Sequence, residues 1–279
     1  MNIEQILKEA IERLKKSNIE EPITKARRIL AHILKVGKEY LITHEKQILS
    51  KEQEKEYLSK ILKVEQGMPI QYIIGKQEFM GIDFIVNENV LIPQPDTEIL
   101  VEKTIEIAKT IEKPIILDMC TGSGAIAISI KKNVNEAQVI ATDISKEALE
   151  VAKQNDKKCE ITFIQSDLFE NINNEFDIIV SNPPYVKKEE IKKLSKEVQN
   201  EPMLALDGGD DGLYFYRKII GQAYKYLKTN GYLCLEIGED QKKEVCNLII
   251  ENGKYAIPIA YKDLENNDRV IITKKVKNS

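Results

Sequence analysis

From Asp96 onward, the chain alternates between strand-like and helix-like segments, and this alternation limits the folds that it can adopt. The strand-like segments are short apolar runs rich in β-branched residues, at 115–119, 138–142, 161–165, 176–181, 231–237 and 270–273. Segments with helical periodicity lie between them, at 97–111, 125–131, 146–155, 213–227 and 240–252. Such alternation predicts an α/β fold, in which a mainly parallel sheet is covered by helices on both faces.

The N-terminal part has a different pattern. Apolar residues recur at steps of three and four over 3–14 and again after Pro22, and a third helical stretch covers 51–65. The segment 79–86 is aromatic and β-branched, and the turn signal Asn-Glu-Asn follows it. We therefore expect a helical N-terminal domain at 1–75, a β-hairpin linker at 76–95 and an α/β domain at 96–279.

Charge and composition exclude several classes of function. The 41 basic and 45 acidic residues give a net charge of −4, so the chain lacks a global basic footprint for nucleic acid, although a local basic face is left open. Four scattered cysteines without C-x-x-C spacing and only two histidines predict reduced thiols and no metal site. The sequence has neither an N-terminal signal segment nor an apolar run near the ~20 residues that span a bilayer. We expect a cytoplasmic protein with no membrane contact.

The segment Asn182-Pro183-Pro184-Tyr185 directly follows the strand-like run 176–181. Two consecutive prolines lack N–H groups and fix φ, so the ladder of the strand must stop there. The carbonyls of this stiff corner and the Asn182 side-chain oxygen are then free to accept hydrogen bonds. Grouped acceptors suit a planar NH2 group that must be held while its nitrogen reacts, which is the chemistry of an amino-group methyltransferase. A simple strand-ending turn is the alternative. Placement disfavours that alternative, because the fourth strand of a doubly wound sheet neighbours the first at the point where ligands bind.

A glycine-containing turn joins the first strand-like run to the next helix, in the sequence Asp-Met-Cys-Thr-Gly-Ser-Gly at 118–124. Gly122 and Gly124 permit a tight turn and a close approach of a ligand to the backbone. The N–H groups at the start of the following helix can face a carboxylate, such as that of a methionine moiety. An ordinary strand-to-helix turn that needs glycine remains the alternative.

Acidic residues end the next two strand-like runs. Asp143 is placed to accept hydrogen bonds from both hydroxyls of a ribose, and its alternative role is to cap the following helix, a role that Ser145 can also take. Asp167 is placed to accept from an adenine amino group with Leu168 packed nearby, and its alternative is a turn aspartate. Acids at successive strand ends, together with the glycine turn, favour a nucleotide-like cofactor.

These motifs resemble those of class I S-adenosylmethionine-dependent methyltransferases that act on an NH2 group. The closer resemblance is to the PrmC/HemK family, the protein-(glutamine-N5) methyltransferases that modify peptide chain release factors. It covers nearly the whole chain and includes segments outside the motifs above, at 69–75, 79–81, 91–98, 201–202, 205–209, 211–213, 235–238 and 268–269, together with Gln241. One departure is Gln94, where the family usually has arginine, which puts any ionic role of that arginine in doubt.

The resemblance implies a Rossmann-like, mostly parallel seven-stranded sheet with a small all-helical N-terminal domain. We expect this domain to recognise the substrate, because one glutamine offers too little surface for specificity; the alternative is a structural cap on the sheet domain. It also implies methylation of the glutamine of a Gly-Gly-Gln motif in class I release factors. Taken with the strand-end pattern, it gives a set of residues that would bind S-adenosylmethionine: Asp118, Cys120, Thr121, Gly122, Ser123, Gly124, Asp143, Asp167, Leu168 and Asn182. The substrate glutamine would be held by Asn182, Pro183, Pro184 and Tyr185, with Asn182, Pro183 and Tyr185 acting in catalysis. The alternative activity is methylation of an exocyclic amino group, adenine N6 or guanine N2, in nucleic acid.

Overall fold

The computed structural model describes residues 1–276. By its internal contacts the chain divides into two compact units. The helical unit comprises Met1–Lys76 and Ser195–Asn200, and the sheet unit comprises Gln77–Leu194 and Glu201–Ser279.

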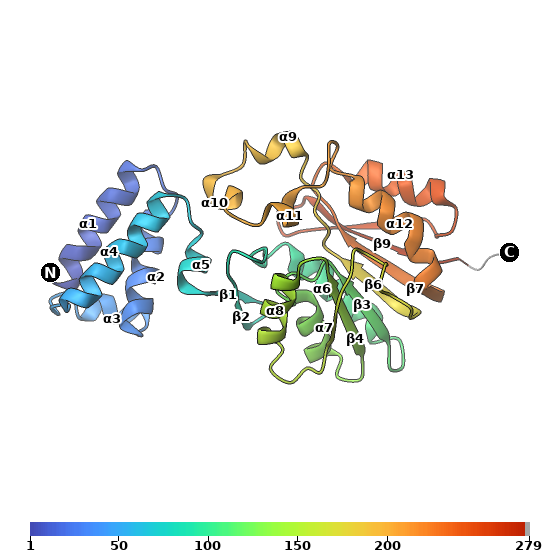
Figure 1. Cartoon of the computed structure of the whole chain (residues 1–279), viewed down its shortest axis with the longest axis horizontal. Helices are drawn as coiled ribbons and strands as arrows, with labels where there is room; N and C mark the ends of the chain where they lie inside the picture. Colours follow the sequence, from blue (N-terminus) through green and yellow to red (C-terminus); the bar gives the residue numbers. More distant parts are fainter. Residues whose placement is uncertain (277–279) are drawn as a thin grey trace. The chain divides into compact units, whose positions relative to one another are not determined.

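The helical unit is built from α-helices that bury one apolar stripe each: α1 (Ile3–Lys16), α2 (Pro22–Leu34), α3 (Lys38–Thr43), α4 (Lys51–Glu65) and α5 (Ile70–Ile74) (Figure 1). Capping boxes start α1 at Asn2 and α4 at Ser50, where each side chain accepts a hydrogen bond from the third helical N–H. The helices predicted over 3–14, after Pro22 and over 51–65 are confirmed. The short α3 and α5 were not predicted, because helices of one or two turns leave no periodic pattern to detect.

A distant piece of sequence completes this unit. The short helix α10 (Lys196–Gln199) lies in the helical unit although its chain neighbours belong to the sheet unit. The buried Lys25 of α2 forms an ion pair with Glu197. In addition, the Asn200 side chain donates a hydrogen bond to the Gly67 carbonyl over 3.1 Å. A buried lysine is costly without a partner, so the α10 segment stabilises the helices that it joins.

The sheet unit contains a seven-stranded sheet in the order β5-β4-β3-β6-β7-β9-β8. Its strands are β3 (Ile115–Met119), β4 (Gln138–Asp143), β5 (Thr162–Gln165), β6 (Phe176–Ser181), β7 (Leu227–Glu236), β8 (Ile259–Lys262) and β9 (Asp268–Lys274). Neighbouring strands from β5 to β7 pair in parallel, and β9 runs antiparallel to both of its neighbours. The predicted mainly parallel, doubly wound sheet is confirmed, and the fourth strand along the chain, β6, does pair with the first, β3.

Helices cover both faces of this sheet (Figure 1). On one face lie α6 (Thr97–Ala108), α7 (Ala125–Asn133) and α8 (Lys146–Asn155), and on the other lie α12 (Tyr214–Tyr226) and α13 (Lys242–Asn252). Successive residues of the central strands alternate between the two cores: Ile116 and Ile178 face the first set of helices, whereas Leu117 and Ile179 face the second. All four are 0% exposed, and each contributes about 1.5–3 kcal/mol by leaving water.

Short elements complete the sheet unit. A separate two-stranded sheet pairs β1 (Lys76–Phe79) with β2 (Ile82–Ile85) around a turn at Met80 and Gly81, both with positive φ. The helices α9 (Lys188–Ile191) and α11 (Met203–Leu206) lie between β6 and α12. The strand β8 was not predicted, because its apolar run is only three residues long (259–261) and lies between Pro258 and the polar pair Lys262-Asp263.

A helix needs about 20 mostly apolar residues to cross a bilayer. Among residues 1–276, none combines the length and the hydropathy that crossing a membrane requires.

Candidate active site

The carboxyl ends of β3, β4, β5 and β6 surround a cavity of about 270 Å³ in the sheet unit. The chain leaves β3 toward β4 on one side, while β6 pairs with β3 on the other, so the cavity lies at the switch point of the sheet. Of the residues predicted from sequence, its lining contains Cys120, Gly122, Asp143, Asp167, Leu168, Asn182 and Pro184. A smaller adjoining cavity is lined by Thr121, Ser123 and Gln94, together with Cys120, Gly122 and Asn182.

The glycine turn after β3 adopts an unusual backbone. Cys120, Gly122 and Gly124 all have positive φ, at 62°, 53° and 80°. A Cβ on Gly122 would meet no atom within 4 Å, because this position faces open space, whereas a Cβ on Gly124 would come within 3.2 Å of Ala152 in α8. Gly122 therefore gives a ligand access to the backbone, while Gly124 lets α7 and α8 pack closely. The positive φ of Cys120, a non-glycine residue, is backbone strain of the kind found at functional sites.

Asp118 lies beneath this turn rather than in the cavity. It is 0% exposed, and its Oδ2 accepts hydrogen bonds from the Thr121 hydroxyl (2.5 Å) and the Ala127 amide (3.1 Å). Burial raises the pKa of its carboxyl to about 7, although these two hydrogen bonds lower it. The structure therefore gives Asp118 a role in shaping the turn. Its direct contact with a cofactor stays a prediction.

Asp143 faces the cavity from the end of β4. Its Oδ2 accepts from the Gly122 amide (2.9 Å) and its Oδ1 from the Ser145 amide (2.9 Å). Burial raises the pKa of this carboxyl, against the lowering effect of these backbone hydrogen bonds. The alternative role as a helix cap does not apply, because the Ser145 side chain caps α8 by accepting from the Ala148 amide. Each carboxylate oxygen keeps acceptor capacity for a ligand.

The turn after β5 brings Asp167 and Leu168 to the same cavity. Leu168 has a φ of 50° and is buried, while Asp167 is half-buried. Ser166 fixes this turn, because its hydroxyl donates to the Leu168 carbonyl (2.9 Å) and accepts from the Asn171 amide (3.0 Å). A carboxylate and an apolar side chain thus lie side by side at the cavity wall.

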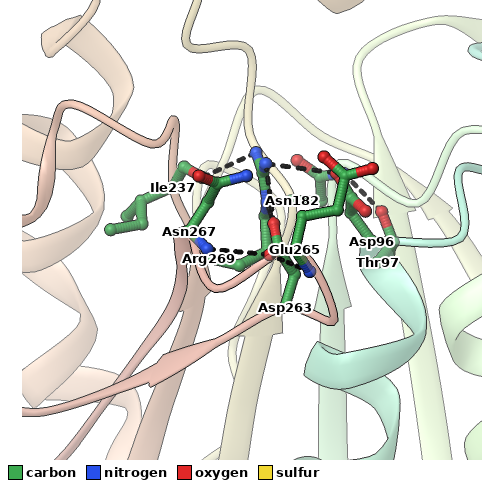
Figure 2. A network of polar contacts seen from close by, with 8 residues as sticks. All are labelled: Asp96, Thr97, Asn182, Ile237, Asp263, Glu265, Asn267 and Arg269. Atoms are coloured by element: carbon green, nitrogen blue, oxygen red, sulfur yellow. Dashed lines mark hydrogen bonds and ion pairs between the residues drawn. The ribbon is translucent and has the colours of Figure 1, made fainter.

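Asn182 follows β6 and lines both cavities. Its side-chain nitrogen donates to the Thr97 hydroxyl over 3.3 Å, at the first residue of α6. Figure 2 shows this contact beside Asp96, which forms an ion pair with Arg269 of β9 over 3.1 Å. Because the nitrogen of the Asn182 amide points to Thr97, its oxygen is directed away from α6. The prolines that follow are buried and hold the backbone of the corner.

Tyr185 does not line either cavity. Its backbone is instead fixed by residues that follow it in the chain. Its carbonyl accepts from the Gln241 side chain over 3.0 Å. A Cβ on Gly208 would come within 2.6 Å of the Tyr185 Cα, and one on Gly212 within 2.5 Å of its carbonyl oxygen. These residues fix the corner from outside, and sequence reasoning did not identify them as part of the site. All three, Gly208, Gly212 and Gln241, lie in segments that resemble the family, but the resemblance does not indicate which backbone atoms they approach.

This close approach predicts the effect of one methyl group. Gly208→Ala is expected to push the Tyr185 backbone, because overpacking costs roughly 1–3 kcal/mol and the added Cβ meets main-chain atoms. We expect turnover to fall by roughly tenfold as the corner shifts by part of an ångström. The measurement is turnover together with the thermal midpoint. Gly221→Ala is the matched control, since Gly221 is exposed in α12 and an added Cβ there meets nothing within 4 Å. This control should keep full turnover, and equal losses in both variants would contradict the assignment.

Known families match both parts of the chain. Residues 5–75 match the PrmC N-terminal domain, and residues 95–209 match the methyltransferase small domain. A release factor glutamine methyltransferase of Fusobacterium nucleatum is 41% identical over 97% of this chain and 78% of its own length. A release factor glutamine methyltransferase of Clostridium acetobutylicum is 40% identical over 98% of both chains. Among solved structures, a methyltransferase from Pyrococcus furiosus covers 79% of this chain and 98% of its own, with 20% identity and a TM-score of 0.53, which shows a shared fold.

Proposed function

The chain belongs to the family of release factor glutamine methyltransferases, and from this premise we propose that it methylates the side-chain amide N5 of a glutamine in peptide chain release factors. The proposed target is the glutamine of the Gly-Gly-Gln motif, and the proposed methyl donor is S-adenosylmethionine. The observation that carries the proposal is the Asn182 corner, which presents acceptors at the edge of the cavity.

The residues around the cavity fit such a donor. Asp143 has acceptor capacity for two ribose hydroxyls, and Asp167 with Leu168 supplies a carboxylate and an apolar surface for an adenine ring. Gly122 leaves open space above its backbone. When bound, S-adenosylmethionine supplies a methyl group that its sulfonium already activates. What remains for the protein is to hold the substrate amide.

An amide nitrogen is a poor nucleophile, because its lone pair is delocalised into the carbonyl. The Asn182 side-chain oxygen and the Pro183 carbonyl can accept the two N–H bonds of the substrate amide. Such acceptors favour a more pyramidal nitrogen and fix the direction of its lone pair. Orientation of this kind can supply several kcal/mol of barrier reduction, up to about 7–11 in ideal cases. Tyr185 is proposed to help to hold the flat amide group of the substrate.

The helical unit is proposed to recognise the release factor. A single glutamine side chain offers too little surface to select one protein among many, so further contacts are needed. A substrate of the translation machinery implies that the enzyme works in the cytoplasm.

Methyl transfer from labelled S-adenosylmethionine tests the proposal, with purified release factor and total nucleic acid offered side by side. We expect label on the release factor, and we expect its loss when the glutamine of the Gly-Gly-Gln motif is replaced. Label on nucleic acid alone would support the alternative activity on adenine N6 or guanine N2 and overturn the proposed substrate. The net charge of −4 favours the protein substrate.

A further inference from the structure

Glu236 is a buried carboxyl group that the mechanism above does not use. It ends β7 and is 2% exposed. Ser181 pairs with Leu235 in the parallel β6–β7 ladder, so Glu236 and Asn182 occupy the next position on the two strands. The Tyr216 hydroxyl donates to the Glu236 carbonyl over 2.9 Å and fixes its backbone. Glu236 is therefore held beside Asn182 at the edge of the site.

Its carboxyl group is only partly satisfied. The Thr97 and Asn182 side chains lie near enough to the Glu236 carboxyl to lower its pKa by hydrogen bonding. The Asn182 nitrogen donates to the Thr97 hydroxyl over 3.3 Å. The Oε2 atom has no hydrogen-bond partner among residues 1–276. A buried acceptor without a partner costs stability, and residues that serve packing alone seldom keep one.

We propose that Glu236 is a positioning residue that fixes, together with Thr97, which end of the Asn182 amide faces the substrate. This inference rests on the proposed function, in which the Asn182 oxygen accepts from the substrate amide. An ionised carboxylate can only accept, so the Thr97 hydroxyl donates to it and uses its own oxygen to accept from the Asn182 nitrogen. The Asn182 oxygen is then the end that remains for the substrate.

Protonation of Glu236 would reverse the direction of the hydrogen bonds between Glu236, Thr97 and Asn182. A neutral Glu236 carries a donor, so it can donate to the Thr97 oxygen, and the Thr97 hydroxyl can then donate to the Asn182 oxygen. The Asn182 NH2 would in that case face the substrate NH2, and two donors cannot pair. Catalysis therefore requires the ionised form of Glu236.

The side chains around Glu236 shift the pKa of its carboxyl so that it changes between the neutral and the ionised form near neutral pH. Burial raises the pKa of its carboxyl to about 7, while Thr97, Arg269 and Asn182 lower it and Asp96 raises it. The phenols of Tyr185 and Tyr216 also lie near enough for its charge to raise their pKa. The group is ionised above its pKa, so turnover should rise as pH increases through about 7 and then level off.

The test compares the pH profile of kcat in the wild type and in Glu236→Gln, between about pH 5.5 and pH 9. At the upper end, Glu236→Gln should lower kcat by roughly tenfold to a hundredfold, because a glutamine both donates and accepts and no longer enforces one amide orientation. The KM for release factor should change little. The rise in kcat near pH 7 should disappear, because a glutamine does not ionise. An unchanged rise in Glu236→Gln would overturn the proposal. The rise would then belong to another group that is present in both proteins, such as Asp118, whose pKa burial also raises to about 7.

Two further variants serve as controls: Asp177→Asn for the loss of a carboxylate elsewhere, on β6, and Thr97→Val for the loss of the bridging hydroxyl. Asp177→Asn removes a carboxylate that accepts from the Ile115 amide and Lys228 at the opposite end of β6, so its pH profile should match the wild type. Thr97→Val keeps the branched shape of the side chain but lacks the hydroxyl. The rise in kcat near pH 7 should therefore disappear in this variant, as in Glu236→Gln. If Glu236→Gln fails to fold, carboxyl carbon NMR of the wild type takes its place. Glu236 should titrate near pH 7, and titration near pH 4.5 would overturn the proposal.

The experiment separates this inference from the proposed function. A wild-type enzyme that fails to label the release factor at any pH contradicts the proposed substrate. A wild-type enzyme that labels it with the same pH profile as Glu236→Gln contradicts only the role of Glu236.

Discussion

Asn182→Ala is expected to lower kcat for methyl transfer by at least about 10²–10³, because loss of one preorganised electrostatic partner typically costs that much. The substitution removes the side-chain oxygen proposed to accept from the substrate amide, together with the hydrogen bond to Thr97. The buried prolines after it should keep the backbone corner in place. The measurement is single-turnover methyl transfer to release factor, with cofactor affinity determined by calorimetry.

Cofactor binding should weaken much less than turnover in this variant. Asn252→Ala is a suitable control, because Asn252 ends α13 and its side chain donates only a long hydrogen bond of 3.5 Å to the Ile220 carbonyl. Turnover of Asn252→Ala should stay near that of the wild type. Near-normal turnover of Asn182→Ala would remove Asn182 from the mechanism.

Asp143→Ala should act on the cofactor instead. A hydrogen bond to a charged group contributes about 1.5–3 kcal/mol. Loss of the two proposed hydrogen bonds to the ribose hydroxyls should therefore weaken S-adenosylmethionine binding by roughly 10²-fold or more. The variant also leaves the Gly122 and Ser145 amides without their acceptor, which should lower stability and loosen the glycine turn. Calorimetric titration with S-adenosylmethionine measures the first effect, and thermal unfolding without ligand measures the second.

Asp156→Ala separates these two effects. Asp156 follows α8, and its carboxylate likewise accepts from two backbone amides, those of Cys159 (2.7 Å) and Ile161 (3.0 Å). Asp156 does not line the cavity. Its loss should therefore lower stability by a similar amount and leave cofactor affinity unchanged. Equal affinity losses in the two variants would mean that Asp143 acts only through folding.

The parts of the site predicted from sequence are those that lie next to strand ends. β3 and β6 have the predicted bounds, because each is a mainly apolar run, interrupted by one aspartate, that is followed by the glycine turn or by Asn182 and two prolines. Asp143 and Asn182 come directly after or at such ends, so their position on one edge of a parallel sheet followed from the order of strands. Asp118 lies within the predicted strand β3, but the sequence did not show that its carboxylate accepts hydrogen bonds from the glycine turn and from α7. Its contact with a cofactor stays a prediction.

The side chains that surround Asn182 from other elements could not be predicted from strand ends. Thr97, Glu236 and Arg269 come from α6, β7 and β9. All three lie in segments that resemble the family, but neither the periodicity nor the strand-end pattern indicates that they meet beside Asn182. Their proximity depends on the antiparallel placement of β9 and on the entry of α6 beside β6. Such long-range contacts are determined by packing rather than by local periodicity.

The α10 segment has a consequence for how this protein can change during evolution. The backbone passes between the two units after Lys76, before Ser195 and after Asn200. A gene fragment encoding only the first 76 residues would lack the partner of Lys25 and the side chain that binds the Gly67 carbonyl. Recombination at a single junction would thus transfer an incomplete helical unit. The two units are therefore not separable modules. Residues 195–200 belong to the helical unit but are encoded within the sequence of the sheet unit, so a gene segment for the sheet unit always carries part of the helical unit with it.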